Sequence, residues 1–231
     1  MRNVSSSNQV QQKYLIKEGQ VKKFMECLSN KIEEDEHFKY TVYNIYYEPV
    51  SETLISKVYK SRIPNEIIRL RSYGIPQISD PVYIEIKETK NEETHKQRLE
   101  LTLDEAYELL CKQHDCGDNQ IDELLRNSGL LPKLFVGYER VAYCSKFNPK
   151  VRLTFSMNIR YRFEDFRLCD LSKNIQLFND DSILLEVSGE SLPEWLTNAI
   201  KICNFKPIQH KAVFHKFKQY EEQLKLSSNY Y

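Results

Sequence analysis

The sequence is poor in glycine and has no excess of charge of either sign. Only 6 of its 231 residues are glycine. Neither GxGxxG nor GxxxxGK[ST] occurs, which argues against a glycine-rich phosphate loop. Lys+Arg and Asp+Glu each total 33, so the formal net charge is zero. Proteins that bind nucleic acid over much of their surface carry an excess of lysine and arginine, so we expect no nucleic-acid partner, although a local basic site is not excluded.

No hydrophobic run in the sequence is long enough to cross a bilayer, and residues 1–10 lack the apolar core of a secretory signal peptide. We therefore expect a cytoplasmic protein, whose association with a membrane would need a membrane partner. The 6 cysteines are scattered along the chain and are expected to be reduced thiols. Zinc binding at Cys111, His114 and Cys116 is disfavoured because a second pair of ligands is missing.

The chain has the length of one domain with a sizeable core. Its 15 tyrosines and 11 phenylalanines favour strands. No repeat and no interdomain linker is visible in the sequence. We predict a single domain over residues 1–231, with flexible ends at 1–10 and 225–231.

Hydrophobic periodicity divides the chain into strands and helices. This mixture predicts an α+β fold with antiparallel strands. Strands are predicted at 12–16, 40–47, 66–73, 82–88, 96–103, 133–147, 151–163 and 182–188. Helices are predicted at 18–32, 102–111, 120–128 and 193–202, with an ambiguous segment at 51–60 and a helix, or a strand followed by a helix, at 211–224.

Charged residues gather on one face of these predicted strands, because side chains two residues apart on a strand point the same way. The pattern places Arg69 beside Arg71 on one strand and Glu85 beside Lys87 on the next. An ordinary antiparallel sheet with one solvated face explains such a pattern. That reading is the more common one for any single strand. A sheet closed into a barrel also explains the pattern, with the charges pointing into a lumen and the apolar face covered by helices.

An excess of cations on the charged face favours the closed barrel. Cations that share a lumen would repel one another without a polyanionic ligand, and arginine suits phosphate oxygens. Hard divalent cations take oxygen ligands from carboxylate and phosphate together. We therefore predict a closed antiparallel β-barrel, a tunnel with a charged lumen covered outside by α-helices, that holds a triphosphate. The cations are Arg69, Arg71, Lys87, Lys96, Arg98, Arg140 and Arg152, and the carboxylates are Glu85, Glu100 and Glu186.

Eight short motifs, in the same order along the chain, resemble the VTC domain (vacuolar transporter chaperone). This is the polyphosphate polymerase branch of the triphosphate tunnel metalloenzyme, or CYTH-like, superfamily. The N-terminal Glu-x-Glu-x-Lys motif of the thiamine triphosphatase and adenylate cyclase branch is absent, which disfavours those activities. The motifs read KYLI, YNIYYEP, IIRLRSYG, VYIEIKE, KQR, YERVAY, VRLTFSMNIRYR and LLEVSGESLPEWL.

The resemblance implies roles for particular residues in a site that binds phosphates with Mn²⁺ or Mg²⁺. It also implies that the metal lies on a carboxylate and that the phosphates lie on cations. By resemblance, the catalytic residues are Arg69, Arg71, Lys87, Arg140 and Arg152, the further phosphate-binding residues are Lys13, Lys96, Arg98, Tyr138 and Lys216, and the metal ligands are Glu186 and, as a possible second, Glu85.

The function that the resemblance implies is a metal-dependent phosphotransferase, a polyphosphate polymerase that passes the γ-phosphate of ATP to a growing chain. Its partners would be ATP and polyphosphate or another polyanionic phosphate. The sequence departs from the family pattern at Ser188, where a lysine is common, and on both sides of Lys216. These departures keep a non-catalytic module that binds polyphosphate, triphosphate or an inositol phosphate as an alternative. An inorganic triphosphatase and a structural protein with a solvated sheet are further alternatives.

Overall fold

The structure, a computed structural model, describes residues 5–6, 10–49, 66–90, 93–112, 130–168 and 174–208. Within these residues the strands form one sheet with the order β1-β6-β5-β4-β3-β7-β8-β10-β2, and β9 pairs with β8 outside this path. The strands are β1 (Ser5–Ser6), β2 (Val10–Lys17), β3 (Ile32–Pro49), β4 (Glu66–Tyr73), β5 (Pro81–Lys90), β6 (Glu93–Thr102), β7 (Leu130–Ser145), β8 (Arg152–Arg162), β9 (Ile175–Gln176) and β10 (Ser182–Gly189). The helices are α1 (Glu18–Leu28), α3 (Leu103–Lys112) and α5 (Glu194–Ile202).

The closed barrel predicted from the sequence is wrong. Among the described residues the sheet ends at β1 on one edge and at β2 on the other, and no ladder joins these two strands. The sheet is therefore open. Alternating polar and apolar residues require only that one face of each strand is buried, which an open antiparallel sheet also provides.

The chain forms two compact units. Unit 1 comprises Met1–Ser6, Val42–Gly137 and Tyr161–Ile175, and unit 2 comprises Ser7–Thr41, Tyr138–Arg160 and Gln176–Tyr231. The long strands β3, β7 and β8 each contribute residues to both units. The predicted segments at 51–60, 120–128 and 211–224 lie outside the described residues.

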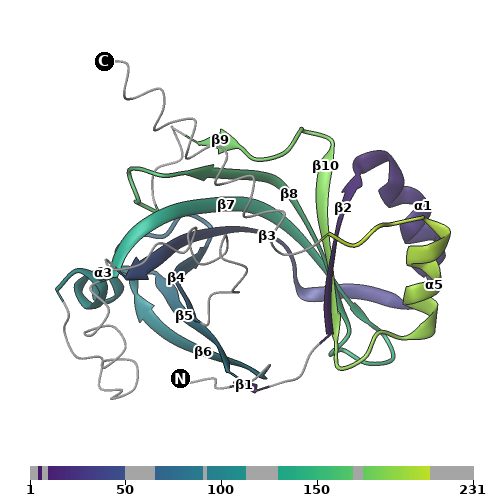
Figure 1. The fold of residues 1–231 in the computed structure, drawn as a ribbon, viewed down its shortest axis with the longest axis horizontal. Helices are drawn as coiled ribbons and strands as arrows, with labels where there is room; N and C mark the ends of the chain where they lie inside the picture. The colour runs from purple at the N-terminus through teal and green to yellow at the C-terminus, as the bar shows by residue number, and fades with distance from the viewer. Residues whose placement is uncertain are drawn as a thin grey trace. The chain divides into compact units, whose positions relative to one another are not determined.

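Unit 1 has its own hydrophobic core, formed by strands β3 to β6 and helix α3. Figure 1 shows β4, β5 and β6 side by side, with α3 at the end of β6. Ile45, Leu70 and Ile84 are fully or almost fully buried, and Ala106 and Leu109 of α3 belong to the same cluster. Since neighbouring side chains on a strand point to opposite faces, this burial directs the intervening polar residues to the other face of the sheet.

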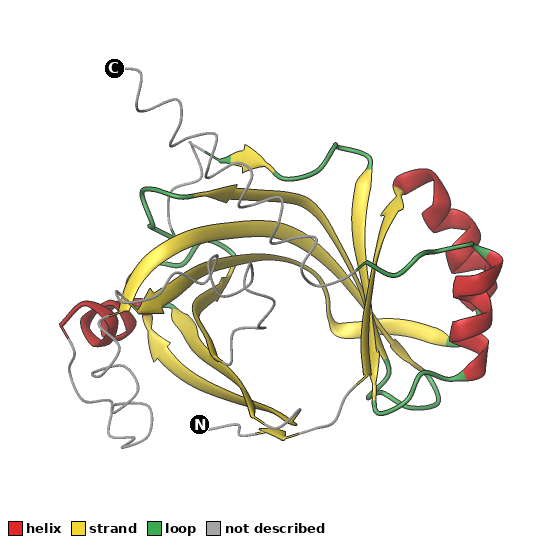
Figure 2. Ribbon diagram, viewed as in Figure 1, coloured by secondary structure: helices red, strands yellow, loops and turns green. Residues whose placement is uncertain are grey.

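Unit 2 has a second core, where α1 and α5 lie together beside β2 and β10 (Figure 2). Phe24 of α1 and Leu196 of α5 are fully buried. They join Leu153 of β8 and Leu185 of β10, also fully buried, in one cluster. The alternate residues of β2, β8 and β10 again form a polar face.

Gly137 of β7 lies against two aromatic rings of the unit 1 core. A Cβ atom at this position would lie 2.9 Å from Cδ1 of Tyr43 and 3.3 Å from Cε1 of Phe135. Both rings are buried and stacked, with their centroids 6.0 Å apart, so neither can move easily. We expect Gly137→Ala to lower the free energy of unfolding by roughly 1–3 kcal/mol, as overpacking does in other cores. Urea denaturation measures this change.

Gly19→Ala is the matched control for that experiment. Gly19 lies in the first turn of α1, and no atom lies within 4 Å of the position that a Cβ would take. Alanine has the higher helix propensity, so this variant should be as stable as the parent or up to about 1 kcal/mol more stable. Equal destabilisation by both substitutions would contradict the close approach at Gly137.

Candidate functional site

The polar face of unit 1 carries three arginines around one carboxylate. Glu85 of β5 lies directly opposite Arg69 of β4 on one side and Arg98 of β6 on the other. Nε and Nη2 of Arg69 lie 2.7 and 2.6 Å from Oε2 of Glu85. Nη1 of Arg71 and Nε of Arg98 lie 3.4 and 3.9 Å from Oε1 of the same carboxylate. The carboxylate of Glu85 therefore interacts with all three arginines.

Neutral side chains of β3 hold two of these arginines. Nε of Arg71 donates a hydrogen bond to Oδ1 of Asn44 at 2.9 Å, and Asn44 is fully buried. Nδ2 of Asn44 donates in turn to the carbonyl oxygen of Val136, 3.2 Å away. Nη1 of Arg69 donates to the hydroxyl of Tyr46 at 3.4 Å. The guanidinium groups of β4 are therefore positioned by the fold before any ligand arrives.

The arginines also control the protonation of Glu85. Burial alone would raise the pKa of this carboxyl, but the charges of Arg69, Arg71 and Arg98 outweigh burial and lower its pKa. Glu85 is therefore ionised at neutral pH. Its charge offsets one guanidinium, which leaves the cluster with an excess of positive charge.

Two lysines extend the cationic surface along the same strands. Lys87 of β5 and Lys96 of β6 are directly opposite each other in the antiparallel register. Like charges in this arrangement destabilise a strand pair.

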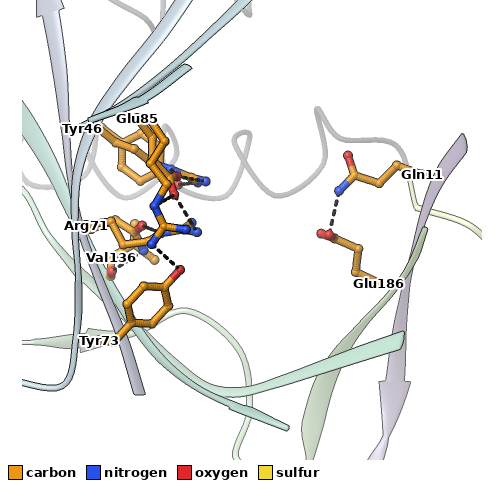
Figure 3. Close-up of polar contacts among 10 residues, drawn as sticks. Gln11, Tyr46, Arg71, Tyr73, Glu85, Val136 and Glu186 are labelled. Carbon is orange, nitrogen blue, oxygen red and sulfur yellow. Dashed lines mark hydrogen bonds and ion pairs between the residues drawn. The ribbon is translucent and has the colours of Figure 1, made fainter. Parts of the chain in front are cut away.

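The polar face of unit 2 centres on Glu186 of β10. Lys13 of β2 lies opposite it, with Nζ at 3.2 Å from Oε2. Nε2 of Gln11 donates to Oε1 of Glu186 at 2.6 Å (Figure 3). Thr154 of β8 flanks Glu186 on its other side, and its buried hydroxyl has no hydrogen-bond partner among the described residues. An oxygen available to a ligand thus lies beside an ionised carboxylate.

Glu186 has the most perturbed carboxyl group of this face. Burial alone would raise the pKa of Glu186. The charges of Lys13 and Arg140 and the hydrogen bond from Gln11 outweigh burial and lower the pKa to about 2. The group is therefore a carboxylate over the whole physiological pH range.

Arg140 of β7 supplies a fixed cation near Glu186. Its Nε donates to Oγ of Ser156 at 3.2 Å, and its guanidinium carbon lies 4.9 Å from the ring centroid of Tyr138. Burial would lower the pKa of Arg140, but Tyr138, Glu186 and Tyr40 together raise it. Arg140 therefore stays charged despite its burial.

The VTC domain family matches residues 8–219, which is most of the chain. The chain belongs to the VTC domain family. This confirms the resemblance that the eight motifs indicate, and it supports a function related to polyphosphate or triphosphate. A comparison of this VTC domain with the curated proteins finds no match.

One solved structure shares the fold of this VTC domain at low sequence identity, and two others are similar over much of the chain at lower scores. A crystal structure of a candidate adenylate cyclase from Bacillus halodurans superposes with a TM-score of 0.53 at 14% identity, over 88% of this chain and 94% of that one. The structure of a protein from Pyrococcus horikoshii superposes with a TM-score of 0.44 at 15% sequence identity, over 87% of this chain and 95% of that one. A chain in the structure of the Mediator head module of Schizosaccharomyces pombe superposes with a TM-score of 0.41 at 10% sequence identity, over 88% of this chain and 92% of that one.

The structure places most of the predicted site residues of this VTC domain on the two polar faces. Arg152 is engaged differently from the others, because it forms an ion pair with Asp35 of β3. Lys216 lies outside the described residues. Unit 1 brings together Arg69, Arg71, Glu85, Lys87, Lys96 and Arg98, and unit 2 brings together Lys13, Tyr138, Arg140, Arg152 and Glu186.

The predicted metal ligands differ in their fitness for a divalent cation. In the described part of the chain, no group of three or more histidine, cysteine or acidic side chains could hold a metal alone. Mg²⁺ sites of phosphate-handling enzymes commonly use one or two carboxylates plus phosphate oxygens. Glu186 lies beside the hydroxyl of Thr154, which has no hydrogen-bond partner among the described residues, and this pair fits that pattern. Lys13 and Gln11 contact the two oxygens of Glu186, so a cation would have to displace them. Both oxygens of Glu85 face arginines, which suits it to holding those arginines.

Among the described helices, none is both long and apolar enough to cross a membrane.

Proposed function

We propose that this VTC domain transfers the γ-phosphoryl group of ATP to the end of a polyphosphate chain. The observation that carries the proposal is the excess of cations on the polar face of unit 1. Three arginines converge on the single carboxylate of Glu85, and Lys87 lies opposite Lys96. A chain of phosphates is attracted to a face on which arginines and lysines gather, and guanidinium forks match phosphate oxygens.

The reaction needs no nucleophile from the protein. An oxygen of the terminal phosphate of the growing chain attacks the γ-phosphorus of ATP and forms a new P–O–P linkage. The bond from the γ-phosphorus to its bridging oxygen breaks, and ADP leaves with that bonding pair. Catalysis of such a transfer rests on positioning and on neutralising charge. Arg69 and Arg71, which Glu85 and Asn44 hold in place, are suited to both tasks.

A divalent cation, Mn²⁺ or Mg²⁺, would neutralise further charge on the phosphate oxygens when bound. The residues suited to hold it are Glu186 and Thr154 of unit 2. Glu186 is ionised, and the hydroxyl of Thr154 is unpaired among the described residues.

The direct test is to incubate the purified protein with ATP and Mn²⁺ and to resolve the products on a polyphosphate-stained gel. We expect a ladder of polyphosphate, with one ADP released for each phosphate incorporated. Chelation of the metal should stop both. Absence of polymer in the presence of metal would rule out the polymerase activity.

A binding module without turnover is the second candidate. The contacts of the two carboxylates favour it. Lys13 and Gln11 already contact the oxygens of Glu186, and arginines already contact those of Glu85, which leaves both carboxylates less able to bind a metal. Stabilisation of the fold by inorganic triphosphate, with no polymer formed, would support this candidate. Release of phosphate from triphosphate would instead indicate a triphosphatase.

A further inference from the structure

Two tyrosines and Arg98 form a stack on the polar face of unit 1. The guanidinium carbon of Arg98 lies 3.6 Å from the ring centroid of Tyr83 and 5.5 Å from that of Tyr73. Nη2 of Arg98 donates to the hydroxyl of Tyr73 at 3.3 Å. The two rings meet edge to face, with centroids 5.6 Å apart and planes at 67°. Arg98 thus joins an aromatic pair to the arginine cluster around Glu85.

The stack is open to solvent at Tyr73, whose residue surface is 42% exposed. Tyr73 is the last residue of β4, and Gly74, with a φ of 79°, turns the chain immediately after it. The turn exposes two apolar side chains, Ile75 at 51% and Ile78 at 60%. An exposed aromatic ring therefore lies beside Arg98, with exposed apolar side chains in the turn that follows it, and binding of inorganic phosphates alone does not require them.

The spacing suits a nucleotide. Tyr73 follows Arg71 by two residues on the same face of β4, a separation of about 7 Å along the strand. Phosphates held by Arg98 would leave an attached nucleoside within reach of the Tyr73 ring. Base stacking on an aromatic side chain contributes about 1–3 kcal/mol, and a guanidinium beside the ring strengthens such contacts.

We propose that Tyr73 and Arg98 form a subsite for the base of a nucleoside triphosphate. The inference rests on the proposed function, since it identifies the nucleotide end of the phosphate-binding face. Tyr83 positions Arg98 by packing its ring against the guanidinium group. Tyr83 itself is not expected to touch the base. The subsite distinguishes a nucleotide from a bare phosphate chain.

The test is titration calorimetry with ATP and, separately, with inorganic triphosphate. Tyr73→Leu should weaken ATP binding about tenfold, the loss of one stacked base, and change triphosphate binding less than about twofold. Tyr73→Phe keeps the ring and should retain ATP binding. Phe147→Leu, which removes an exposed aromatic ring from the turn between β7 and β8 of unit 2, is the matched control and should affect neither ligand.

A second measurement serves if Tyr73→Leu does not fold. The triphosphate of 2-aminopurine riboside loses fluorescence when its base stacks, so it should be quenched by the unmodified protein. Absence of quenching with retained binding would overturn the subsite. Equal loss of ATP and triphosphate affinity in Tyr73→Leu would also overturn it, because Tyr73 would then act only by holding Arg98. If the unmodified protein binds neither ligand, the proposed function fails as well.

Discussion

Arg69→Ala should abolish polyphosphate synthesis and weaken the binding of inorganic triphosphate by about 10- to 100-fold. The reason is the loss of a positioned guanidinium, since a hydrogen bond to a charged group contributes about 1.5–3 kcal/mol. Arg69 is a stronger candidate than Arg71 for contact with a ligand. Its side chain is 29% exposed, whereas that of Arg71 is 10% exposed and anchored on Asn44. Calorimetry gives the affinity, and a polyphosphate gel gives the synthesis.

The fold should survive this substitution, because Glu85 keeps Arg71 and Arg98 as neighbours and no lone buried charge is created. Arg167→Ala is the matched control. It removes the same charge from the same unit, but from an exposed ion pair with Asp165 in the segment after β8. Its triphosphate affinity should stay within about twofold of the parent, as exposed pairs contribute little. Full synthesis by Arg69→Ala would contradict the assignment of this face.

The strands could be predicted from the sequence because alternation is a local property. The segment predicted at 66–73 matches β4, and that predicted at 182–188 falls within β10. The helix predicted at 18–32 instead ends at Leu28, because Ile32 already begins β3. The acidic residues that follow Ile32 belong to this strand of 18 residues. Charged residues are uncommon in strands, so the sequence predicts this strand only from residue 40 onward.

Closure of the sheet could not be predicted in the same way. Whether a sheet closes depends on the pairing of its first and last strands, which are distant in the sequence. The alternation within 82–88 is identical in an open sheet and in a barrel. The excess of cations on one face does not distinguish the two architectures either, because an open sheet can carry the same cations on one face.

The charged residues of the candidate site were predictable, whereas their neutral partners were not. Arg69, Arg71 and Glu85 stand out in the sequence by type and spacing. Asn44 could have been found as the one amide side chain among the aromatic and branched residues of YTVYNIYY. Thr154 carries no such signal, because its importance comes from lying opposite Glu186 in the register of β8 and β10. Register is a long-range property that a single sequence does not display.

Glu186→Gln should lower the free energy of unfolding at neutral pH by up to about 3 kcal/mol. The pKa of Glu186 is about 2 in the folded protein, against an ordinary value of 4.5. A depressed carboxyl pKa contributes stability that is fully present above the ordinary value and is lost as the pH falls toward the folded value. The parent and the variant should therefore differ most at neutral pH and converge between about pH 4.5 and 2. Urea denaturation at several pH values measures the difference.

Glu190→Gln provides the matched control, because Glu190 is 59% exposed and pairs with Lys150 at the surface. That substitution should change stability by less than about 1 kcal/mol. A Glu186→Gln profile parallel to that of the parent at all pH values would contradict the ion-pair account. The same variant separates stability from metal binding. If Glu186 holds the cation, the Mn²⁺ concentration that supports half-maximal synthesis must rise in folded Glu186→Gln, whereas a purely structural role for Glu186 leaves that concentration unchanged.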